Sequence, residues 1–150
     1  MATEGAALSD LYTEVIGEHS RLPENKGALA TATVRERGHN PSCGDEITLE
    51  LEIADGVIKD AGFTGVGCAI SQASTDIMID LMRGKTVEEA HRLAQLFTAM
   101  IKREVTDDSA LEELDEAIAL KNISNMPARV KCAVLAWHTL EDVLKEGQTS

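Results

Sequence analysis

Three cysteines and one aspartate have side chains that suit metal chemistry: Cys43, Asp45, Cys68 and Cys132. Each cysteine lies at an element boundary: in a predicted loop before a strand, after a strand, and in the opening turns of a helix. Asp45 follows Cys43 by two residues, so in an extended chain the two side chains point the same way. Three thiolates and one carboxylate form a four-coordinate donor set that Zn²⁺ accepts. The pattern is therefore compatible with a zinc site, although the chain contains no Cys-x-x-Cys pair.

Other interpretations of these residues stay open on the sequence alone. The cysteines also suit small buried apolar side chains, and Asp45 suits a turn or a helix cap. His39, in the same predicted loop, is a rival fourth ligand. Arg129 and Lys131 stand shortly before the third cysteine. They are candidates to offset the negative charge of a buried thiolate site, or they are ordinary surface cations.

Composition narrows the class of protein. The chain has 150 residues, which suits a single domain over 1–150. It carries 14 Lys and Arg against 26 Asp and Glu, a net charge of −12. That balance argues against nucleic acid or an anionic membrane as a partner, because both need a basic face. The N-terminus does not read as a signal peptide and no apolar run is long enough to span a bilayer, so we expect a cytoplasmic protein.

The first half of the chain predicts one helix followed by strands. Apolar residues at helical spacing predict a helix over 8–16, ending near Gly17. Strands are expected over 29–37, 47–53 and 57–66, with Asp55-Gly56 as a two-residue hairpin turn. Gly62 and Gly65 indicate a bulge or a close backbone approach in the last strand. Three consecutive antiparallel strands imply a meander.

The second half of the chain predicts helices. One begins after Cys68, capping boxes at Thr86 and Ser109 open two more, and Pro127 suits the first turn of the last. Strands followed by helices predict an α+β fold: a three-stranded antiparallel meander sheet covered on one face by helices.

Four segments together resemble the IscU/NifU-type iron–sulfur cluster assembly proteins. They are LYTEVI at 11–16, PSCGD at 41–45, GVGCAIS at 65–71 and RVKC at 129–132. The resemblance covers nearly the whole chain and implies the IscU-like fold.

Within that family the chain is most similar to the SufU branch. Sixty-three residues separate Cys68 from Cys132, more than in scaffold-type relatives, and residues 86–101 resemble the SufU-type insertion. Lys131 stands directly before the third cysteine, where scaffold-type IscU proteins carry a histidine. Glu24 departs from the family, which usually has a basic residue after the proline.

The resemblance implies Zn²⁺ held by Cys43, Asp45, Cys68 and Cys132, with Cys43 as the sulfur acceptor and Arg129 pairing with the site during exchange. It implies a zinc-dependent sulfurtransferase for iron–sulfur cluster biogenesis. The sulfur donor would be a SufS-type cysteine desulfurase, a pyridoxal-phosphate enzyme, and SufBCD-type assembly machinery would lie downstream. Two alternatives remain: a non-enzymatic scaffold on which a [2Fe–2S] cluster is assembled from the same cysteines, and a structural zinc domain that acts as a binding module.

Overall fold

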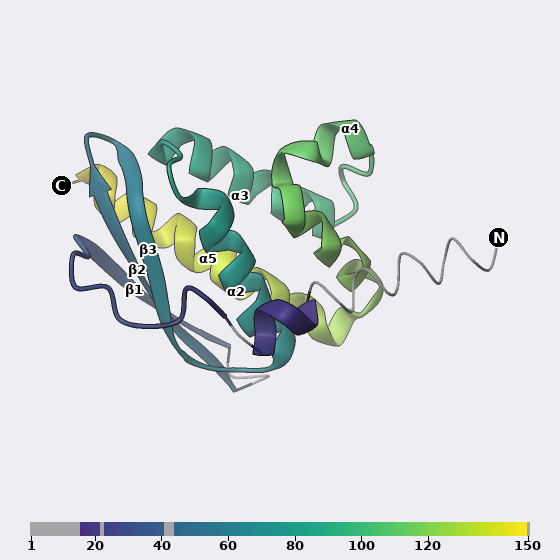
Figure 1. Cartoon of the computed structure of the whole chain (residues 1–150). Helices are drawn as coiled ribbons and strands as arrows, with labels where there is room; N and C mark the ends of the chain where they lie inside the picture. The colour runs from purple at the N-terminus through teal and green to yellow at the C-terminus, as the bar shows by residue number, and fades with distance from the viewer. Residues whose placement is uncertain (1–15, 22, 41–43, 150) are drawn as a thin grey trace.

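The computed structural model describes residues 16–21, 23–40 and 44–149. Its sheet has the antiparallel order β1-β2-β3, formed by β1 (Val34–Asn40), β2 (Asp45–Ala54) and β3 (Val57–Val66). The elements that follow are α2 (Ala69–Met82), α3 (Val87–Ile101), α4 (Asp108–Leu111), the 3-10 element η1 (Glu112–Asn125) and α5 (Pro127–Thr149). Figure 1 shows the helices gathered on one side of the sheet, with α5 lying along it. The predicted α+β meander is confirmed.

The β2–β3 hairpin forms at the predicted turn. Asp55 and Gly56 lie between the paired residues Ala54 and Val57, and both have positive φ, 55° and 73°. Two consecutive residues with positive φ are typical of the type I′ turn, whose twist matches that of the flanking strands.

The glycine in the middle of β3 marks a close approach of two backbones. A Cβ on Gly62 would lie 2.9 Å from the carbonyl oxygen of Gly27, so only glycine fits there. The irregularity in the β2–β3 pairing lies elsewhere, between Glu52 and Ile53. Of the two alternatives that the sequence offered for Gly62, the structure shows the close backbone approach.

The first strand begins later than predicted. The expectation was 29–37, whereas β1 covers Val34–Asn40. The residues at 29–32 form a turn instead, and the amide of Leu29 donates a 2.6 Å hydrogen bond to the Glu50 carboxylate. His39 is consequently part of the strand and not of the loop.

The N-terminal helix extends further than predicted. Residues 16–21 are helical, so the helix continues past Gly17, while 8–15 lie outside the described residues. A glycine inside a helix costs only about 1 kcal/mol. Pro23 is the stronger stop signal, because a proline disfavours helical geometry in the residue before it.

The central contact between α2, α3 and α5 surrounds Trp137. The Ser74 hydroxyl on α2 donates to the carbonyl of Ala133 at 2.6 Å and accepts from the Trp137 ring nitrogen at 2.9 Å. Phe97 of α3 stacks on the Trp137 ring with centroids 4.0 Å apart. These contacts fix the N-terminal half of α5, which carries Cys132, against α2.

The helix starts follow local chemistry in one case and depart from it in another. Thr86 and Glu89 form the predicted capping box of α3. The predicted box at Ser109 does not form; Asp107 caps α4, accepting from the Ser109 amide. The chain then kinks at Asp115 inside η1, where φ is 51°.

Among the described residues, no helix combines the length and the apolar character that crossing a bilayer requires.

Candidate metal centre

Asp45 is held in place by the start of β2. It pairs with Asn40 at the end of the β1–β2 ladder, and its side chain is buried. Its Oδ1 accepts a 2.8 Å hydrogen bond from the backbone amide of Cys68, and its Oδ2 lies 3.9 Å from the Cys68 Sγ. One carboxylate oxygen is thus hydrogen-bonded to the main chain, while the other faces the Cys68 sulfur.

Cys68 is the N-cap residue of α2. Its backbone is extended, and its Sγ accepts from the amide of Ser71 at 3.5 Å. The N-terminal end of a helix favours negative charge. The position therefore suits a sulfur that carries charge as a thiolate.

Cys132 completes a group of three donors. It is buried in α5, and its Sγ, the Cys68 Sγ and a carboxylate oxygen of Asp45 all lie within 4.8 Å of one another. Ligands bound tetrahedrally at about 2.3 Å lie about 3.8 Å apart. Shifts of about 1 Å would therefore bring these donors to zinc-binding distances. Neither cysteine forms a disulfide, so the donor set fits the metal that the resemblance implies.

The glycine before Cys68 makes room for this arrangement. A Cβ on Gly67 would lie 2.7 Å from the Asp45 Oδ1 and 3.1 Å from the Ser71 Oγ. Real Cβ atoms essentially never approach an oxygen as closely as 2.7 Å. The absence of a side chain at Gly67 is therefore what lets the Asp45 carboxylate lie against the main chain.

The other predicted site residues lie as follows. Cys43 lies outside the described residues. Arg129 is exposed in the first turn of α5. His39, the rival ligand, is exposed on β1 and is not among the converging donors of the described part of the chain.

A second group of titratable side chains was not anticipated. Nδ1 of His19 lies 2.6 Å from Asp76 on α2, and its Nε2 lies 2.7 Å from Glu116 on η1. Burial lowers the pKa of His19, but hydrogen bonds and charge from the two carboxylates outweigh it, so the pKa is raised. These partners are 57 and 97 residues away in sequence. No local pattern in the sequence connects residues so far apart.

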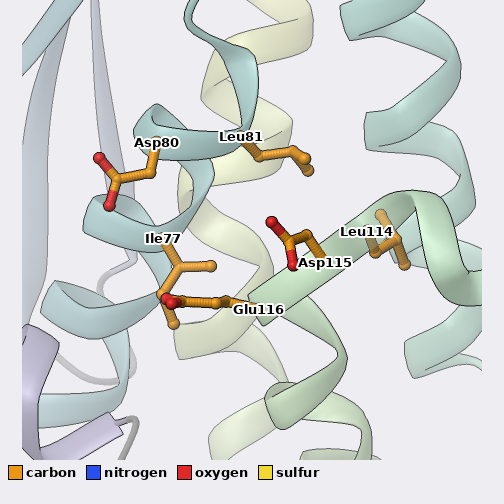
Figure 2. A pocket seen from close by; sticks show the side chains of 6 residues that line it. All are labelled: Ile77, Asp80, Leu81, Leu114, Asp115 and Glu116. Atoms are coloured by element: carbon orange, nitrogen blue, oxygen red, sulfur yellow. The ribbon is translucent and has the colours of Figure 1, made fainter.

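Figure 2 shows the adjoining hollow, in which Asp115 and Glu116 reach from η1 toward Ile77 of α2. Asp80 lines the same hollow. His19, Asp76 and Asp80 offer ligand atoms within 4.8 Å of one another. The imidazole already has a carboxylate at each nitrogen, and the group therefore fastens the N-terminal helical residues to α2 and η1.

Comparison with known proteins identifies the family. The model of the NifU-like N-terminal domain matches residues 11–147. The chain therefore belongs to this family, which includes the IscU and SufU proteins of iron–sulfur cluster assembly.

Similar relatives carry two kinds of name. The chain is 44% identical to the iron–sulfur cluster assembly scaffold protein IscU of Thermotoga maritima, covering 91% of this chain and 94% of the relative. It is 40% identical to the zinc-dependent sulfurtransferase SufU of Bacillus subtilis, covering 91% and 90%. A crystal structure of a candidate SUF-system scaffold protein from Fervidobacterium islandicum has a TM-score of 0.82 and 40% identity, covering 89% and 96%.

Proposed function

We propose that this chain is a zinc-dependent sulfurtransferase that accepts persulfide sulfur from a SufS-type cysteine desulfurase for iron–sulfur cluster biogenesis. The observation that carries the proposal is the convergence of the Asp45 carboxylate with the Cys68 and Cys132 sulfurs within 4.8 Å. The name of the Bacillus subtilis relative supports the zinc-dependent activity. Lys131, in place of the histidine that the resemblance leads one to expect in scaffold-type proteins, favours this branch.

Zn²⁺ would be held by Cys43, Asp45, Cys68 and Cys132. When bound, it would keep its cysteine ligands deprotonated as thiolates. Asp45 is fixed by the Cys68 amide, Cys68 is fixed as a helix cap, and Cys132 is buried in α5. Cys43 belongs to a segment punctuated by proline and glycine, so it is the ligand that we assign to sulfur acceptance.

The proposed transfer is a thiolate–persulfide exchange. The Cys43 thiolate attacks the terminal sulfur of the persulfide on the donor protein, and a new S–S bond forms. The S–S bond of the donor breaks, its electron pair stays on the donor cysteine, and that cysteine leaves as a thiolate. Arg129, exposed near Cys132, would pair with anionic groups during this exchange.

Two large apolar side chains are exposed at positions close in sequence to the candidate ligands. Val66, two residues before Cys68, is 67% exposed, and Met126, just before α5, is 43% exposed. They are the large apolar residues that the described part of the chain exposes.

Two measurements on the purified chain test the proposal. Metal analysis should find about one zinc ion per chain. A SufS-type desulfurase supplied with cysteine and a reductant should release sulfide faster when the chain is present. In a separate reaction without the reductant, which would remove a persulfide, mass spectrometry should find an added sulfur atom on Cys43. Cys43→Ala should keep the fold and abolish both the added sulfur and the stimulation.

Three outcomes would contradict the proposal. Iron with sulfide in place of zinc would favour the scaffold function. Zinc without any persulfide on Cys43 would favour a structural zinc module. Sulfur transfer by Cys43→Ala at the wild-type rate would remove Cys43 as the acceptor.

A further inference from the structure

The hydroxyl of Ser71 is a buried polar group without a partner. Ser71 is 1% exposed, and its Oγ forms no hydrogen bond. In the described part of the chain only one other buried side-chain atom, Nε2 of Gln72, shares this condition. Buried polar groups are nearly always hydrogen-bonded, so an exception calls for a physical reason.

The main-chain groups of Ser71 are already engaged. Its amide donates to the Cys68 Sγ at 3.5 Å, and its carbonyl accepts from the Thr75 hydroxyl at 2.8 Å. The hydroxyl is the one polar group of this residue that remains available. A serine hydroxyl turns freely about its C–O bond, so it can donate to whichever acceptor comes within reach.

The Asp45 carboxylate lies close to the Ser71 hydroxyl. The Ser71 Oγ lies 3.1 Å, and the Asp45 Oδ1 2.7 Å, from the point that a Cβ on Gly67 would occupy. Both oxygens therefore border the same small space beside Gly67. The Asp45 Oδ1 accepts one hydrogen bond from Cys68, and a carboxylate oxygen has room for a second.

We propose that Ser71 is a positioning residue of the metal centre, whose hydroxyl donates to the Asp45 carboxylate when Asp45 serves as a ligand. This inference rests on the proposed function, because it requires that Asp45 bind zinc. Carboxylate ligands are usually held by hydrogen bonds from groups that do not touch the metal. The Ser71 hydroxyl, which has no partner in the structure, then has the Asp45 carboxylate as its acceptor in the metal-bound protein.

The test compares the full-length chain with Ser71→Ala. Competition with a chelator should show zinc binding weakened by about 10- to 100-fold. The metal-free variant should melt at the wild-type temperature or above, because the substitution removes a buried hydroxyl without a partner. Cobalt substituted for zinc should give altered visible absorption bands, since the orientation of the carboxylate changes.

Ser74→Ala is the matched control on the same helix. The Ser74 hydroxyl forms hydrogen bonds with Ala133 and Trp137, so its loss should lower the melting temperature of the metal-free protein. Ser71→Ala and Ser74→Ala are thus expected to differ in their effect on the melting temperature of the metal-free protein.

The inference is overturned if Ser71→Ala binds zinc as tightly as wild type. It is also overturned if this variant loses metal-free stability as Ser74→Ala does, because Ser71 would then be structural. If the wild-type chain itself does not bind zinc, the proposed function fails together with the inference. If only the expected effect of Ser71→Ala is missing, the inference fails and the proposed function stands.

Discussion

The carboxylate of Asp45 accepts a 2.8 Å hydrogen bond from the backbone amide of Cys68, 23 residues further along the chain. This bond joins the first residue of β2 to the cap of α2. It also turns the second carboxylate oxygen toward the Cys68 sulfur. The orientation of one candidate ligand is therefore set by the main chain of another.

Gly67→Ala should disturb that orientation. The new Cβ would lie 2.7 Å from the Asp45 Oδ1, so the carboxylate must move. We expect zinc affinity to fall by about 10- to 100-fold, measured by competition with a chelator. Gly17→Ala is the control, because its Cβ would meet only the Arg21 side chain at 3.8 Å. Equal zinc affinity in the two variants would show that the space beside Gly67 is not needed.

Asp45→Asn separates the charge of the side chain from its hydrogen bond. Asparagine can still accept from the Cys68 amide through its carbonyl oxygen, but it brings no negative charge to the thiols. We expect a folded protein with weaker zinc binding, shown by near-wild-type circular dichroism and a lower metal content. Stoichiometric zinc at undiminished affinity, with unchanged sulfur transfer, would remove Asp45 from the ligand set.

The stability of the protein should depend on pH through His19. The pKa of His19 is raised from its ordinary value of 6.5, so the folded state binds the proton more tightly than the unfolded state. The stabilisation that the protonated His19 adds to the free energy of unfolding is fully present below about pH 6.5. It is lost as the pH rises through the folded-state pKa of His19. His19→Gln should therefore show a smaller decrease in unfolding free energy over this range, measured by denaturant titration.

His138→Gln is the control for this pH dependence. His138 is exposed on α5, so its replacement should leave the pH profile of wild type in place. Identical profiles for wild type and His19→Gln would contradict the assignment to His19.

Phe97→Ala tests whether α3, which covers most of the segment that resembles the SufU-type insertion, is part of the core. Phe97 is buried and stacks on Trp137. Truncation of a buried phenylalanine costs about 3–5 kcal/mol. Denaturant unfolding should show a loss of this size. A loss below about 1 kcal/mol would mean that α3 packs independently of the core.

Local sequence chemistry predicted much of the fold. The turn at Asp55-Gly56 and the capping box at Thr86 depend on neighbouring residues only, and both form as expected. The start of β1 was predicted wrongly, because the Glu50 carboxylate holds the preceding turn. The cap at Ser109 failed because Asp107 competes for the same helix start.

The candidate site was predictable only in part. Residue types and family resemblance singled out Asp45, Cys68 and Cys132, whose donors the structure brings together. Their binding of zinc stays a prediction. The unpartnered Ser71 hydroxyl could not have been foreseen, because burial and hydrogen bonding arise only from the folded arrangement.

The capping role of Cys68 has a mechanical consequence. Its sulfur accepts the Ser71 amide at the first turn of α2, so swinging that sulfur outward would leave the amide without its acceptor. A cysteine that accepts sulfur from another protein would have to move its side chain toward that protein and back. The cap contact therefore holds the Cys68 sulfur at the start of α2, and under the proposed function we expect another cysteine to accept the sulfur.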